Sequence, residues 1–347
     1  MKLPGIGFFE FLKPSNENIL KAESEFSQNS NKKFWDATNS LNLTIVKQNS
    51  VNIFSKYEKL KQDPQIISKQ KKNGVIIGVI GSIISIPIAI LTQEFIVLIF
   101  GLIISWTYYL SITAYYKNLA IDLVKAQIAK ENNWLYDPEK NQSKWNDLAR
   151  YFPEIFQKGN KDRYVEDTFW GTYQNNNKTT HFNSGRFSYT VETGSGKNRS
   201  SVKYHKNYFI FAIPKELKSR FHMFPENIGS KIGNFFSKKE INTESIEFNK
   251  TFAFSYNGKK GDQALHIVKT LSPAMQEKLI KLAKEKNDTN ILFAHNTITF
   301  CFDGYMINNP KTNLEKEIKL NNEDKKEIEN QMNYLIDISN QMTKYLD

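Results

Sequence analysis

Two adjacent carboxylates, Glu166 and Asp167, are the side chains of this chain best suited to acid–base chemistry. Glycoside hydrolysis uses two carboxyl groups at a defined separation. Neighbouring side chains of a strand point to opposite faces, whereas a loop would let both reach one cleft. We interpret the pair as a turn and cap before a strand at Phe169. A hydrolase that uses the pair with a distant histidine is the alternative, and no catalytic residue is assigned.

The histidines and the cysteine indicate no metal or cofactor. No histidine pair has the spacing H-E-x-x-H or H-x-x-x-H of a helical zinc site. A single cysteine, Cys301, excludes a disulfide framework and any multi-cysteine metal site. Nothing near Cys301 in the sequence would depress its pKa and make it a nucleophile. The five histidines are His181, His205, His222, His266 and His295.

A glycine-rich stretch, residues 193–198 (TGSGKN), resembles a phosphate-binding loop only superficially. It lacks the spacing G-x-x-x-x-G-K-[ST], and it joins two strand-like runs instead of opening a helix. We therefore predict that it is the tip of a β-hairpin.

Basic residues gather in two clusters that predict contacts with a protein partner, an anionic lipid surface, or both. Lysine beside exposed phenylalanine suits an anionic bilayer, where each basic residue contributes about 1 kcal/mol. An ordinary solvated basic face is the alternative. One cluster surrounds the predicted hairpin tip and the other lies in residues 230–239; together they comprise Lys197, Arg199, Lys203, Lys206, Lys231, Phe235, Phe236, Lys238 and Lys239.

The part of the chain from about residue 161 reads as an α+β domain, mainly antiparallel β with flanking helices. Short runs of alternating apolar residues predict strands. Ser272 and Pro273 predict the start of a helix, and residues 323–346 predict a last, amphipathic helix. The predicted strands are residues 169–173, 180–192, 202–213, 221–224, 245–256 and 290–302.

Two uncharged stretches, residues 74–91 and 95–116, are 18 and 22 residues long. As helices they would be about 27 and 33 Å long, close to the ~30 Å thickness of a bilayer core. Because only three residues separate them, we predict an antiparallel transmembrane hairpin. The lysines that flank it predict that both termini lie in the cytoplasm and that the protein lies in the cell membrane.

Small residues recur at a spacing of four within the predicted hairpin. Gly74 and Gly78 form one such pair, and Gly101 and Ser105 form the other. Small residues at this spacing let helices approach closely. They would serve either to pack the two spans together or to associate copies of the chain.

The sequence thus divides into five predicted regions. They are a polar N-terminal segment (1–72), the transmembrane hairpin (73–117), a helical connector (118–160), the α+β cytosolic domain (161–310) and a C-terminal helix (311–347).

Over residues 70–305 the chain resembles an uncharacterised bacterial membrane protein family, domain of unknown function 3137. The resemblance rests on Tyr164 with Glu166–Asp167 and residues 169–171 (FWG), and on residues 208–213, 247–255 and 271–275. The chain departs from the family pattern at residues 264–267 (ALHI), where the family carries an acid and an arginine. The resemblance implies a two-span hairpin followed by a cytosolic α+β domain, and no activity.

With 47 basic and 36 acidic residues the chain has a net charge of +11. We expect a membrane-anchored cytosolic interaction or scaffold protein whose partners are the lipid bilayer and another protein. A homo-oligomer is an open alternative, and nucleic acid is not an expected partner. Two other functions stay open at this point, which are a membrane-bound, hydrolase-like enzyme and an oligomeric pore formed by the hairpin.

Overall fold

A computed structural model describes most of the chain. The described residues are 43–92, 96–175, 178–213, 220–226, 243–256, 267–268, 271–294, 296–304, 311–314 and 321–344. They fall into two compact units. The first comprises the described residues of 1–47, 133–308 and 330–347, and the second those of 48–132 and 309–329.

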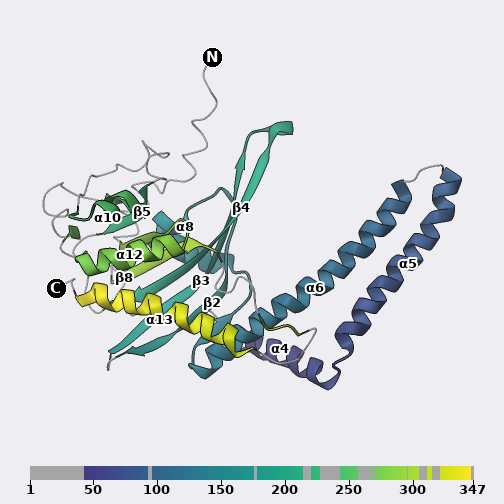
Figure 1. Cartoon of the computed structure of the whole chain (residues 1–347), viewed down its shortest axis with the longest axis horizontal. Helices are drawn as coiled ribbons and strands as arrows, with labels where there is room; N and C mark the ends of the chain where they lie inside the picture. The colour runs from purple at the N-terminus through teal and green to yellow at the C-terminus, as the bar shows by residue number, and fades with distance from the viewer. Residues whose placement is uncertain are drawn as a thin grey trace, which may run out of the picture. The chain divides into compact units, whose positions relative to one another are not determined.

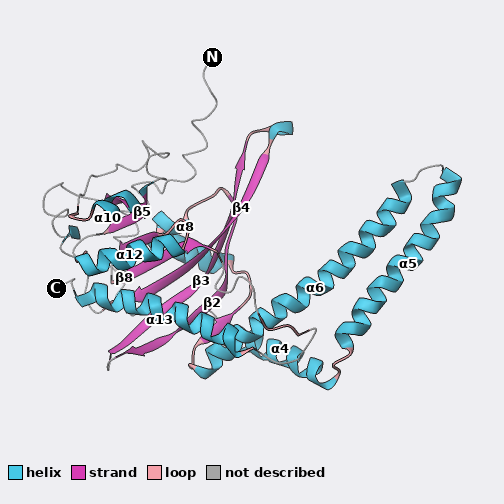
Figure 2. Ribbon diagram, viewed as in Figure 1, coloured by secondary structure: helices cyan, strands magenta, loops and turns pink. Residues whose placement is uncertain are grey.

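The first unit is built on one sheet, in which the described residues form eight antiparallel strands. The strand order is β1-β2-β3-β4-β8-β7-β5-β6, and Figure 2 shows the strands in magenta. Every neighbouring pair of strands is antiparallel. The strands are β1 (Leu135–Asp137), β2 (Lys161–Asn175), β3 (Lys178–Thr193), β4 (Ser200–Ala212), β5 (Phe221–Pro225), β6 (Phe252–Tyr256), β7 (Asn290–Ala294) and β8 (Thr297–Asp303).

Helices cover both faces of this sheet. The central strands carry apolar side chains on both faces, and each face needs a cover that keeps it from water. Tyr208 and Ile210 of β4 pack into one core with α7 and α8. On the other face, Phe209 of β4 stacks on Phe302 of β8. The amine of Lys286, the residue just after α12, lies 5.6 Å from the centre of the Phe302 ring. Figure 1 shows α12 beside α13 across the sheet. The helices of this part are α7 (Gln142–Tyr151), α8 (Pro153–Phe156), α10 (Ile246–Thr251), α12 (Pro273–Glu285) and α13 (Asn322–Lys344).

The helix predicted at Ser272 is confirmed, with its cap. The Ser272 hydroxyl accepts a hydrogen bond from the Met275 amide at 3.4 Å, and Pro273 is the first helical residue. The strand predicted at 245–256 is half wrong, because residues 246–251 form α10. Ser245 accepts from the Phe248 amide at 3.2 Å, and this cap starts a helical turn that buries Phe248 before β6 begins.

The second unit contains most of α4 (Leu43–Gln62) and two longer helices, α5 (Ile66–Thr92) and α6 (Ile96–Glu131). Helix α6 begins in the second uncharged stretch and runs on into the predicted connector. Its last turns bury Leu123, Val124 and Ile128. Tyr116 of α6 donates a hydrogen bond to Gln70 of α5 at 2.7 Å.

The predicted transmembrane hairpin is contradicted. Among the described residues, no helix combines the length and the apolar character needed to cross a membrane. The prediction rested on two uncharged stretches of 18 and 22 residues. The helices that form extend beyond those stretches into charged turns, with Lys71 and Lys72 in α5 and Lys117 and Asp122 in α6. The predicted membrane location and the cytoplasmic placement of both termini fail with the hairpin.

Helix α7 carries a buried lysine. Lys144 is 1% exposed, and its Nζ lies 3.0 Å from the centre of the Trp170 ring on β2 without a hydrogen-bond acceptor. Burial lowers the pKa of Lys144 well below its ordinary value, and nearby Asp137 opposes this shift only in part. The side chain therefore packs chiefly as a hydrocarbon and an N–H donor to the indole face.

Replacing Lys144 with methionine should stabilise the protein by about 1–2 kcal/mol at pH 7. The folded pKa lies below the unfolded one, so the unfolded state binds more protons, and wild-type stability should rise from pH 7 towards pH 9. Lys144→Met should flatten that rise. Thermal unfolding measures both effects, and Lys281→Met, at an exposed lysine of α12, is the control. A less stable Lys144→Met variant would contradict this account.

Candidate interaction surface

A β-bulge brings Glu166 and Asp167 to the same arginine. The register of β2 against β3 shifts between Glu166 and Phe169, and Asp167 has a φ of 55°. Arg186 lies 3.0 Å from Glu166 through Nε and 3.4 Å from Asp167 through Nη2. Tyr136 also donates to Asp167 at 3.0 Å. Because a bulge re-aims a side chain, neighbours that would point apart share one face.

Ser188 and His205 extend this cluster, in an order that does not suit hydrolysis. The Ser188 hydroxyl donates to Glu166 Oε1 at 3.2 Å and lies 2.8 Å from His205 Nδ1. The one proton of this hydroxyl is directed to the ion-paired Glu166 carboxylate, whereas a catalytic serine donates to its histidine. Ser188 is also fully buried. The cluster therefore has the contacts of a structural clamp.

A chain of charged and polar groups runs through the core under α8. Arg220 binds both oxygens of Glu154 at 2.6 Å, and both side chains are buried. His222 Nε2 donates to Asn290 Oδ1 at 3.2 Å, and Lys158 reaches the same oxygen at 3.4 Å. Each of these contacts joins residues at least 66 positions apart in the sequence. No local pattern could have marked them as neighbours.

Lys206, predicted on the basic surface, lies in this interior instead. It is 2% exposed and pairs with Asp288 and with Asp303, the latter at 2.5 Å. Burial disfavours its charge, but Asp288 more than compensates and raises its pKa above the ordinary value. Cys301 is buried beside it, and burial raises the pKa of its thiol to about 11. Such a thiol is a poor nucleophile at neutral pH.

The other residues of the first basic cluster occupy a projecting hairpin, which we call the β3–β4 arm (residues 191–204). Strand β2 pairs with β3 only as far as Thr190, and β8 pairs with β4 only from Lys206. Beyond these points β3 and β4 pair with each other alone, and Figure 2 shows them rising from the sheet. The tip is a 3₁₀ turn, residues 196–198. The predicted hairpin tip at 193–198 is thus confirmed.

The arm presents basic and apolar side chains together. Every residue from Ser200 to Tyr204 is exposed. Val202 is 49% exposed, and Tyr204 stacks on Tyr189 with 5.2 Å between ring centres. Lys203 lies 5.4 Å from the centre of the Tyr164 ring. A hydrogen bond with Tyr164 raises its pKa, so Lys203 is a cation at neutral pH.

The charge near the tip is partly balanced. Arg199 pairs with Glu192, and Lys161 of β2 reaches the same carboxylate at 3.1 Å. Lys197 belongs to the 3₁₀ turn itself. Residues 191–205 contain three basic residues and one acidic residue. The arm therefore carries a positive excess on a surface open to solvent.

The second predicted cluster lies outside the described residues, together with two of the five histidines. These positions are Lys231, Phe235, Phe236, Lys238, Lys239, His266 and His295. Of the residues predicted to pack helices, Gly74 and Gly78 belong to α5, and Gly101 and Ser105 belong to α6. A Cβ at Gly74 would lie 2.7 Å from the Tyr108 ring, so only glycine lets α6 approach there.

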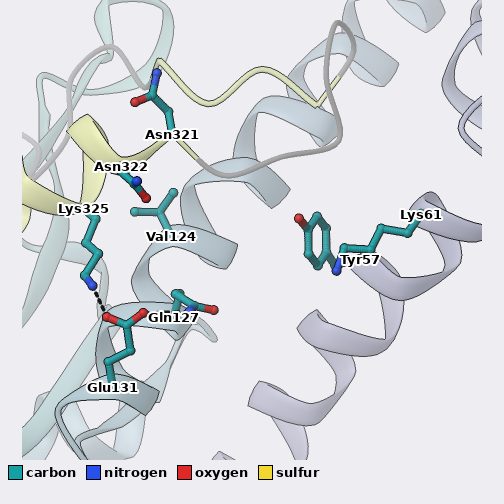
Figure 3. Close-up of a pocket in the computed structure, with 8 residues that line it drawn as sticks. All are labelled: Tyr57, Lys61, Val124, Gln127, Glu131, Asn321, Asn322 and Lys325. Atoms are coloured by element: carbon teal, nitrogen blue, oxygen red, sulfur yellow. Dashed lines mark hydrogen bonds and ion pairs between the residues drawn. The ribbon is translucent and has the colours of Figure 1, made fainter.

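The second unit contains an open polar pocket of about 290 Å³. Figure 3 shows it between α4, α6 and the start of α13. Val124 forms its one apolar wall, and Lys325 is paired with Glu131 across it. Gln127 donates to Glu131 at 2.8 Å. Gln127, Glu131 and Lys325 thus bind one another in the wall of the pocket. Its remaining lining residues are Tyr57, Lys61, Asn321 and Asn322.

Helices α5 and α6 also expose large apolar side chains. Val75, Ile83 and Ile90 of α5 are each more than half exposed, as are Ile104 and Trp106 of α6. Exposed apolar surface of this kind marks sites of association.

Among the described residues no group of histidine, cysteine and carboxylate side chains could hold a metal ion. Comparison with known proteins finds no matching protein family, no matching curated protein and no matching solved structure. The resemblance stated above therefore stays a prediction.

The buried His222 should make stability fall in acid. Burial, and next Lys158, lower the pKa of His222 from 6.5 to about 4. The unfolded chain thus binds more protons between these values, and stability should decrease as pH falls from about 6.5 to 4, by roughly 3 kcal/mol at most. Urea unfolding at several pH values would measure this decrease.

His222→Gln keeps a hydrogen-bonding group near Asn290 and should remove most of this acid dependence. His181→Gln, at an exposed position of β3, is the control and should leave it intact. An unchanged pH profile in His222→Gln would show that other groups cause the acid sensitivity.

Proposed function

We propose that this chain is a non-enzymatic interaction protein and that the β3–β4 arm docks on an acidic segment of a protein partner. The observation that carries the proposal is the run of five consecutive exposed residues in β4, Ser200 to Tyr204. A strand with both faces exposed buries little of its own apolar surface. Its order comes from pairing with β3 and from the Tyr204–Tyr189 stack.

The charge of the arm supports an acidic partner. Lys203 is a cation, and Glu192 offsets only part of the charge of Arg199 and Lys161. Complementary charge raises the rate of encounter and fixes register, with a dependence on salt concentration. The exposed Val202 and Tyr204 add apolar area that charge alone would not supply. Aromatic residues and arginine are typical anchors of protein interfaces.

The described clusters offer less support for an enzyme. Glu166 and Asp167 are occupied by Arg186, Tyr136 and Ser188. Cys301 is buried with a raised pKa. The predicted family resemblance implies no activity either. The proposal therefore rests on the arm.

Charge reversal on the arm should weaken binding to acidic peptides. The probes are two eight-residue peptides, each with four glutamates and four valines, one in alternating order and the other in two blocks. We expect the Kd of the alternating peptide to rise at least tenfold in a Lys203→Glu, Arg199→Glu double variant, which corresponds to about 1.4 kcal/mol. Isothermal titration calorimetry at low salt would measure it.

Lys281→Glu, at an exposed lysine of α12 that is not part of the arm, is the matched control and should leave the Kd unchanged. Failure of both peptides to bind the wild-type protein would overturn the proposal. So would equal loss of binding in the control variant, because binding would then reflect net charge alone.

A further inference from the structure

The two edges of the β3–β4 arm differ in how their backbone groups are satisfied. In an antiparallel pair, the N–H and C=O groups of successive residues point alternately to the partner strand and away from it. At each edge of a two-stranded arm, half of these groups therefore point outward. Unpaired outward groups are a template for another strand.

Asn160 covers the outer edge of β3. Its backbone amide donates to the Thr190 carbonyl at 3.0 Å. Its side chain accepts from the Glu192 amide at 2.9 Å and donates to the Glu192 carbonyl at 3.0 Å. One asparagine thus serves as a short strand at this edge and continues the pairing of β2 by one step.

The outer edge of β4 has no such cover in the described part of the chain. The Ile213 amide, just after β4, donates to the Asn296 carbonyl on the β8 side. The pairing of β4 with β3 runs without a shift from residue 200 to residue 211. By alternation, the backbone groups of odd-numbered residues face the β8 side. Ser201 and Lys203 therefore point their backbone groups outward, where the described pairing with β8 has ended at Lys206.

We propose that the acidic partner segment binds by adding a strand to the outer edge of β4 along Ser201–Lys203, an inference that rests on the proposed function of the arm. Such β-strand addition draws affinity from main-chain hydrogen bonds and specificity from alternate side chains. A second copy of this chain is a poor occupant, because pairing β4 with β4 would bring Lys203 and Arg199 of both copies together.

The side chains of β4 define the sequence that fits. Ser201 and Lys203 lie on one face of the arm, and Val202 and Tyr204 lie on the other. A strand added beside them would place alternate residues next to the lysine and next to the apolar pair. The partner segment should therefore alternate acidic and apolar residues.

The test uses the full chain and the alternating and block glutamate–valine peptides described above. Ser201→Pro removes the outward N–H of residue 201 and leaves the hydrogen bonds to β3 intact, since proline is tolerated at strand edges. Ser201→Ala removes the hydroxyl and keeps the N–H. We expect the alternating peptide to bind at least tenfold more tightly than the block peptide. Ser201→Pro should remove that difference, and Ser201→Ala should retain it.

Hydrogen exchange gives a second measurement that does not depend on the proline variant. With the alternating peptide bound, the amides of Ser201 and Lys203 should exchange at least tenfold more slowly than in the free protein. Equal binding of the two peptides, or unchanged exchange at both amides, would overturn strand addition while leaving the acidic docking function in place. If neither peptide binds the wild-type protein, the docking function itself is overturned.

Discussion

The interior of the sheet unit depends on the pairing of buried charges. Arg220 of the segment before β5 and Glu154 of α8 are both buried and form a two-point ion pair. Lys206 of β4 is held by Asp288 and Asp303, next to β7 and at the end of β8. Leaving one such charge without its partner would cost several kcal/mol. These pairs therefore fix α8, β4, β5 and β8 in one arrangement.

This constraint also determines where the arm begins. Lys206 is the last residue of β4, counting towards the arm, that β8 covers, and its ion pairs anchor the strand there. From Tyr204 outward, β4 is exposed on both faces. The arm is thus an extension of a strand whose inner half is buried in the core. A ribbon held in this way presents its edge without a large cost in conformational entropy.

The bulges of β2 fix the positions of charged side chains on the opposite surface of the sheet. Asp162 and Asp167 both adopt positive φ, at 50° and 55°, where β2 shifts its register against β3. The second shift turns Glu166 and Asp167 towards Arg186. Their carboxylates are thereby used within the fold, as are Ser188 and His205. The carboxylates that the sequence offers as catalytic candidates thus make structural contacts within the fold.

The sequence by itself determined most of the strands with alternating apolar residues, the capped start of α12, and the hairpin tip at residues 193–198, but it joined β7 and β8 into one predicted strand at 290–302. These are local, since periodicity, a serine cap and glycine with positive φ act over a few residues. Only the tertiary structure decided that uncharged length did not amount to a membrane span, that Lys206 is interior, and that β4 has an uncovered edge. Burial and pairing depend on contacts between distant strands, and one-residue alternation cannot reveal which strand will lie beside another.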